Sequence, residues 1–238
     1  MPAKKKYPIL RQPDDITCGP TALHSVYEYH SDAMDLDTVV KEVPMLRGGG
    51  TLGALLGLHA LRRGYDVEIY SYNLQVFDPT WFKPTSLGND QLIEKLRLQM
   101  KAKRGKKLHV ALQAYIEFLE AGGVIRFEDL TASLLSNFLL TGRPLLTGLS
   151  ATYLYRAVRE HGKYPKGDDI RGEPQGHFVV LTSFDAELNT VTVADPYHPE
   201  SNDYGHVYRV NVEHLVNAIL LGVVTYDGNL IVITKRQV

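Results

Sequence analysis

Residues 176–197 have the sequence GHFVVLTSFDAELNTVTVADPY, and the predicted fold class follows from its pattern. Two segments of it, 177–184 and 190–194, are rich in the β-branched and aromatic residues that favour strands. The short polar stretch between them has the composition of a turn. We therefore predict an antiparallel β-hairpin whose open end brings His177 and Asp195 close together.

Outside this hairpin, predicted strands gather toward the C-terminus and predicted helices toward the N-terminus. Further strands are expected at 144–150, 207–210 and 230–234, with a helix at 212–221. Apolar residues recur at helical spacing in the earlier part of the chain, in segments 20–30, 35–43, 51–63, 89–103, 109–120 and 127–140, with one strand at 67–72. Such segregation predicts an α+β fold rather than an alternating parallel one. We expect one domain over residues 1–238, with a helical lobe at about 12–142 and an antiparallel sheet lobe at about 143–238.

The composition excludes several classes of protein. The 238 residues hold 26 Lys and Arg against 27 Asp and Glu, a net charge of -1, so the basic field typical of nucleic-acid binding is absent. The chain has one cysteine, which excludes a disulfide scaffold and a zinc site built on several cysteines. No cofactor or metal is expected. Since no apolar stretch is long enough to span a bilayer or act as a signal peptide, we expect a cytoplasmic protein with no membrane partner.

The single cysteine, Cys18, stands at the predicted start of the first helix. The unpaired N–H groups at a helix N-terminus carry a partial positive charge that stabilises a thiolate. Gly19 allows the backbone of a substrate to approach closely. Cys18 is therefore a candidate nucleophile, and the alternative is a small buried hydrophobic residue.

A nucleophilic cysteine needs a base, a group that orients the base, and donors for the oxyanion. His177 is the candidate base, since it begins a predicted strand that would hold it rigidly. Asp195 at the other end of the hairpin can accept a hydrogen bond from the imidazole and fix its tautomer. Gln12, six residues before Cys18, can supply an amide donor, and the backbone N–H of Cys18 can supply a second one.

These residues, taken in chain order, resemble a papain-like cysteine peptidase. The resemblance rests on Gln12 and on the motifs CGPTAL at 18–23, GHFVVL at 176–181 and ADPY at 194–197. More narrowly, the chain is similar to peptidase family thirty-nine, the double-glycine leader peptidases of bacteriocin export, and to their stand-alone bacterial relatives. The resemblance implies a papain-like fold, a peptide or protein substrate, Cys18 as nucleophile, His177 as base, Asp195 as orienting residue and Gln12 as oxyanion donor.

The resemblance supports the catalytic residues more strongly than it supports leader-peptide cleavage. Transporter-linked members often carry an acidic residue just before the cysteine, where this chain has Thr17. We expect a hydrolase that cleaves a peptide or amide bond through a thioacyl intermediate. Two alternatives stay open: an acyltransferase or peptide ligase that uses the same triad, and a peptide-binding module without turnover. The sequence carries no signal for the oligomeric state.

Overall fold

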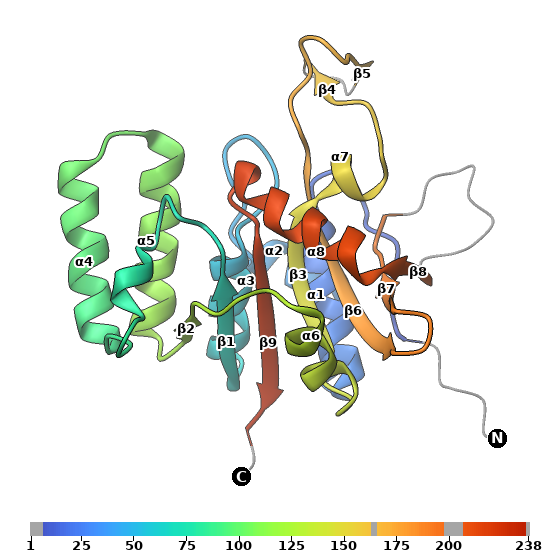
Figure 1. Ribbon diagram of the computed structural model, residues 1–238, viewed down its shortest axis with the longest axis horizontal. Helices are drawn as coiled ribbons and strands as arrows, with labels where there is room; N and C mark the ends of the chain where they lie inside the picture. The colour runs from blue at the N-terminus through green and yellow to red at the C-terminus, as the bar shows by residue number, and fades with distance from the viewer. Residues whose placement is uncertain (1–6, 163–165, 198–206, 237–238) are drawn as a thin grey trace.

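The computed structural model describes residues 7–162, 166–197 and 207–236, and a seven-stranded sheet lies at its centre (Figure 1). The strands are β1 (Tyr65–Ser71), β2 (Val124–Arg126), β3 (Leu145–Ser150), β6 (Gly176–Asp185), β7 (Thr190–Ala194), β8 (Val207–Asn211) and β9 (Asn229–Lys235). Their order is β2-β1-β9-β3-β6-β7-β8. All neighbours are antiparallel except β1 and β2, which are parallel.

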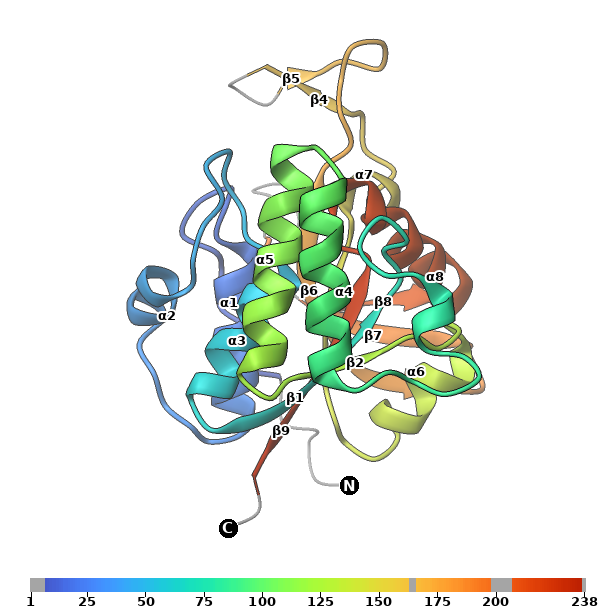
Figure 2. The same ribbon diagram turned by 90° about the vertical axis from the view of Figure 1, so that its left-hand side faces the viewer.

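Helices make up about half of the rest of the described chain. They are α1 (Cys18–Tyr29), α2 (Leu36–Glu42), α3 (Gly53–Arg62), α4 (Asn89–Ala102), α5 (Lys106–Glu120), α6 (Ala132–Leu139), α7 (Ala151–Leu154), α8 (Val212–Leu221) and the 3-10 helices η1 (Pro79–Trp81) and η2 (Gly222–Thr225). α4 and α5 lie side by side on the outside of the molecule (Figure 2). None of the helices described is both long enough and apolar enough to cross a membrane.

The predicted hairpin is confirmed and consists of β6 and β7. Val180 lies opposite Ala194, and Asp185 lies opposite Thr190 near the turn. A register shift between Leu181 and Ser183 marks a β-bulge, which the sequence pattern does not reveal. β3 pairs with the other edge of β6, so both neighbours fix the strand that carries His177.

Alternate residues of β6 divide between two hydrophobic cores, one on each face of the sheet. Phe178 and Val180 pack in the core that includes residues of α1, α3, α4 and α5, whereas Val179 and Leu181 pack with α6 and α8. Successive side chains of a strand point to opposite faces, so a strand buried on both sides needs an unbroken apolar run. The run at 178–181 meets that need and places β6 in the interior.

The α+β class is confirmed, but the expected boundary near residue 142 does not separate helices from strands. β1 and β2 precede that boundary, yet both belong to the seven-stranded sheet. β1 pairs with β9 from the far end of the chain, with Ile69 opposite Ile231 and both side chains fully buried. Burial of these apolar residues on a shared sheet draws the two halves together, which local periodicity does not show.

The expected helix at 127–140 is shorter than predicted. The hydroxyl of Thr131 accepts a hydrogen bond from the backbone N–H of Leu134 at 3.1 Å, and this cap starts α6 at Ala132. A second small sheet, formed by β4 (Glu160–His161) and β5 (Lys166–Gly167), stands clear of the main sheet in both views (Figures 1 and 2).

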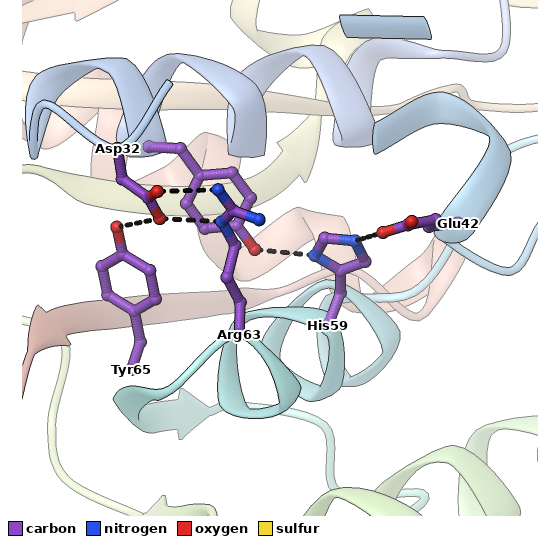
Figure 3. A network of polar contacts seen from close by, with 6 residues as sticks. Asp32, Glu42, His59, Arg63 and Tyr65 are labelled. Carbon is purple, nitrogen blue, oxygen red and sulfur yellow. Dashed lines mark hydrogen bonds and ion pairs between the residues drawn. The ribbon is translucent and has the colours of Figure 1, made fainter. Parts of the chain in front are cut away.

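A polar network joins the C-terminal end of α1 to α2 and α3 (Figure 3). Arg63 donates to both carboxylate oxygens of Asp32 at 2.7 Å, and the hydroxyl of Tyr65 donates to the same carboxylate at 2.9 Å. Beside it, His59 lies 2.7 Å from the hydroxyl of Tyr27 and 3.1 Å from Glu42. Burial lowers the pKa of His59, so the ring is neutral near pH 7.

Replacing Asp32 by asparagine is expected to lower the free energy of unfolding by about 1 kcal/mol at pH 7. The hydrogen bonds from Arg63 hold the pKa of Asp32 below its usual value of 3.8. A depressed pKa stabilises the fold above the unfolded value, and the stabilisation is lost as the pH falls through the folded value. Urea denaturation should therefore separate Asp32→Asn from wild type at pH 7 and bring the two together in strong acid. An equal gap at both pH values would contradict this account.

Candidate active site

Cys18 is the first residue of α1 and is only 8% exposed. α1 packs against β6, and the side chain of Cys18 contacts that of His177, the second residue of β6. No residue in the first turn of α1 is acidic, and the preceding residue Thr17 makes no side-chain cap. The N–H groups at the helix start therefore keep a partial positive charge next to the Cys18 side chain.

His177 lies between Cys18 and Asp195. Its Nε2 is 2.8 Å from Oδ1 of Asp195, and both side chains are nearly fully buried. Since Nε2 faces the carboxylate, Nδ1 is the ring nitrogen left for the contact with Cys18. Burial lowers the pKa of His177, but the negative charge of Asp195, the hydrogen bond to it and the contact with Cys18 outweigh burial and raise the pKa to about 10. At neutral pH the ring is an imidazolium.

Two tyrosines hold the carboxylate of Asp195, and sequence reasoning did not identify either of them in that role. The hydroxyls of Tyr155 and Tyr208 each donate to Oδ2 at 2.6 Å, while the backbone N–H of Tyr197 donates to Oδ1 at 2.9 Å. Burial raises the pKa of Asp195, but the charge of His177 and these hydrogen bonds hold it below its ordinary value. Asp195 is therefore an oriented carboxylate at neutral pH.

No local sequence pattern predicts that Tyr155 and Tyr208 contact Asp195, because only the fold brings them together. Tyr155 follows α7, 40 residues before Asp195, and Tyr208 lies on β8, 13 residues after it. Burial raises the pKa of both phenols far above the usual value of 10, so both remain hydrogen-bond donors. The rings of Tyr155 and Tyr197 also flank the imidazole, with centroids 6.0 and 6.3 Å from that of His177.

Gln12 reaches the site through its backbone. Its N–H donates to the carbonyl of Pro196 at 2.9 Å, which places it beside Asp195. Its side-chain Nε2 donates to the carbonyl of Asp14 at 2.7 Å, and its Oε1 is buried without a hydrogen-bond partner among the described residues. The structure thus brings Cys18, His177 and Asp195 together through the central imidazole. It holds the backbone of Gln12 beside Asp195 through Pro196, with one side-chain amide N–H of Gln12 donated to Asp14.

The part of the chain that the structure describes shows no group of three or more His, Cys, Asp or Glu side chains that could hold a metal ion. The chemistry that this cluster can perform is that of an oriented imidazolium beside a thiol at a helix N-terminus. Such an arrangement suits nucleophilic attack on a carbonyl carbon.

Comparison with known proteins identifies a family that matches most of the chain. A family model described as "Peptidase_C39 like family" matches residues 4–218. No curated protein matches the chain.

Similar solved structures include the double glycine motif protease from an AMS/PCAT transporter, solved in complex with a leader peptide. It has a TM-score of 0.45 and 13% identity, and the match covers 96% of this chain and 91% of that chain. The peptidase domain of Streptococcus ComA, a bifunctional ABC transporter of a quorum-sensing pathway, has a TM-score of 0.44 and 15% identity, covering 97% and 99%. Xylellain, a cysteine protease from Xylella fastidiosa, has a TM-score of 0.43 and 14% identity, covering 98% and 85%.

Proposed function

The chain belongs to the Peptidase_C39-like family of cysteine peptidases, and from that premise we propose that it hydrolyses a peptide or amide bond through Cys18, His177 and Asp195. The single observation that supports this most is the continuous contact from Asp195 through His177 to Cys18. Cys18 at the start of α1 is far in sequence from His177 and Asp195, which lie 18 residues apart on the β6–β7 hairpin. Nucleophile, base and orienting group therefore stand in the order that the chemistry requires.

The first half of the reaction forms a thioacyl enzyme. The Cys18 thiolate attacks the carbonyl carbon, and the π electrons move onto oxygen. The backbone N–H of Cys18 and the side-chain amide of Gln12 donate to this oxyanion. As the tetrahedral intermediate collapses, the His177 imidazolium gives its proton to the leaving amine and the C–N bond breaks.

The second half releases the acid. His177, now neutral, takes a proton from water, and the resulting hydroxide attacks the thioester carbonyl. Collapse of this second intermediate breaks the C–S bond, returns the thiolate and leaves a carboxylic acid. Asp195 keeps the imidazole in one orientation throughout, because Tyr155, Tyr208 and the Tyr197 N–H fix its own carboxylate.

A cleavage screen tests the proposal. A proteome-derived peptide library is incubated with wild-type protein and with Cys18→Ala, and new N-termini are identified by mass spectrometry. We expect cleavage products with wild type only. Absence of products from a wild-type protein whose Cys18 still reacts with iodoacetamide would overturn hydrolysis. Products that carry an added amine, when one is supplied, would instead show acyl transfer.

Replacing Gln12 by alanine is expected to reduce kcat about 10²-fold on the best peptide from that screen, with a smaller change in KM. The loss follows because one oxyanion donor acts mainly in the transition state. Steady-state kinetics measure it, and Gln12→Glu, which keeps the size but replaces the donor with a carboxylate, should be impaired at least as much. A Gln12→Ala protein with wild-type kcat would remove Gln12 from the mechanism.

A further inference from the structure

A second carboxyl group, that of Asp227, lies buried near His177 and takes no part in the mechanism above. It is 7% exposed and sits between η2 and β9. Its Oδ2 is 3.0 Å from the hydroxyl of Thr225, and its backbone N–H donates to the carbonyl of Gly222 at 2.9 Å. Its Oδ1 is buried and has no hydrogen-bond partner among the described residues. A buried oxygen left unpaired costs stability, so its retention calls for a role.

The carboxyl of Asp227 packs directly on the backbone next to His177. A Cβ added at Gly176 would lie 2.2 Å from Oδ2 of Asp227 and 2.6 Å from the Thr225 hydroxyl. A Cβ at Gly148, on the neighbouring strand β3, would lie 2.7 Å from the Asp227 carbonyl. Two glycines thus make room for this one acidic residue. Gly176 immediately precedes His177, so Asp227 is held against the start of the strand that carries the imidazole.

Among the described residues, two titratable groups from other elements face Asp227. His177 faces it from β6 and Tyr115 faces it from α5. Burial raises the pKa of Asp227 to about 8, while the Thr225 hydroxyl and the positive charge of His177 act in the opposite direction. Burial also raises the pKa of Tyr115, to about 12, so this phenol is uncharged while Asp227 titrates. Near pH 7 Asp227 is a neutral acid, and it does not compete with Asp195 for the imidazolium.

We propose that Asp227 is a positioning residue that acts through His177. The carboxyl group of Asp227 is neutral in the working state. Once this carboxyl group loses its proton, it places a second negative charge beside the imidazolium of His177. The extra charge stabilises the imidazolium, so His177 holds its proton more tightly and becomes a weaker acid toward the leaving amine. The coupling therefore slows proton delivery to the leaving amine once the pH is high enough to ionise Asp227. The inference rests on the proposed function, because it concerns the proton that His177 delivers there.

The titration of His177 tests this inference without a substrate. Histidine rings labelled with 13C at Cε1 are followed by NMR from pH 6 to 11, and the His177 signal is assigned by its absence in His177→Gln. In wild type we expect an inflection near pH 8 from Asp227, followed by the main transition of the imidazole. In Asp227→Asn the inflection disappears, and the main transition moves to lower pH by about one unit.

A second variant keeps the test valid if Asp227→Asn does not fold. Thr225→Val removes the hydroxyl that lowers the pKa of Asp227 but leaves the acid in place, so the inflection should move above pH 8. Titration curves without an inflection in wild type, or an inflection that Thr225→Val does not move, would overturn the inference. If the titrations are as expected but no peptide is cleaved, only the proposed function is refuted. Cleavage without the inflection would refute only the role of Asp227.

Discussion

Replacing Cys18 by alanine is expected to abolish cleavage of every peptide that the wild-type protein hydrolyses, with kcat/KM at least about 10⁴-fold lower. The chain has one cysteine, so no other thiol can take over the attack. The oxyanion donors and the imidazolium would remain, but without a nucleophile they stabilise no thioacyl intermediate. Progress curves on the best peptide measure the loss, and an acid quench followed by mass spectrometry should show an acyl adduct on wild type only.

A second variant of Cys18 and a labelling experiment distinguish loss of the nucleophile from loss of the fold. Cys18→Ser keeps the size of the side chain and should be nearly as inactive, because a hydroxyl at this position is a much weaker nucleophile. Both variants should unfold at close to the wild-type temperature. In wild type, iodoacetamide at pH 6 should label Cys18 at least about 10-fold faster than in His177→Gln, because the variant lacks the ring that contacts the Cys18 side chain and can take its proton. More than a few per cent of wild-type activity in Cys18→Ala would refute the mechanism.

Replacing Asp195 by alanine is expected to lower the free energy of unfolding by about 3–5 kcal/mol and to remove most activity. The change leaves the buried imidazole of His177 without its acceptor, and it leaves the hydroxyls of Tyr155 and Tyr208 without theirs. It also removes the charge that raises the pKa of His177, so the ring becomes neutral at pH 7. Chemical denaturation measures the stability, and iodoacetamide labelling at pH 6 should slow in parallel.

The pH dependence of this effect has a defined sign. The pKa of His177 is raised above its unfolded value of 6.5, so its stabilisation is complete below 6.5 and is lost as the pH rises toward about 10. The pKa of Asp195 is lowered, so its stabilisation is complete above 3.8 and is lost as the pH falls through the folded value. The destabilisation by Asp195→Ala should therefore be greatest between pH 3.8 and 6.5.

An exposed ion pair provides the control for Asp195→Ala. Asp66 pairs with Arg236 at 2.7 Å, but its side chain is 64% exposed. Asp66→Ala should cost no more than about 1 kcal/mol at any pH, because solvent screens such pairs. Equal losses in the two variants would mean that the buried carboxylate contributes no more than a surface one.

Local sequence signals predict the elements that carry the candidate site. The alternation and β-branched residues at 177–184 and 190–194 specify the hairpin, and the polar residues between them specify its turn. Cys18 at the start of an amphipathic segment is enough to place a thiol at a helix N-terminus. The periods of helices and strands appear in the spacing of apolar residues within a short segment. The hairpin and the first helix can therefore be predicted without knowing the fold.

Contacts between segments that are distant in sequence cannot be predicted from local patterns. β1 joins the sheet because it pairs with β9, about 165 residues later, and no local pattern records that partner. Tyr155 and Tyr208 meet at Asp195 only because β7, β8 and the chain after α7 converge. Asp227 becomes a buried acid next to His177 only because Gly148 and Gly176 leave space for it.

The α+β class, the hairpin and the choice of candidate nucleophile, base and orienting group could all be predicted before the fold was known, because they depend on periodicity and on the chemistry of each residue type. The tertiary structure alone decided how Asp195 is held, that His177 is an imidazolium, and that a second carboxyl lies beside it. Hydrogen-bond partners and burial shift a pKa through contacts between distant segments, and such contacts exist only after the chain has folded.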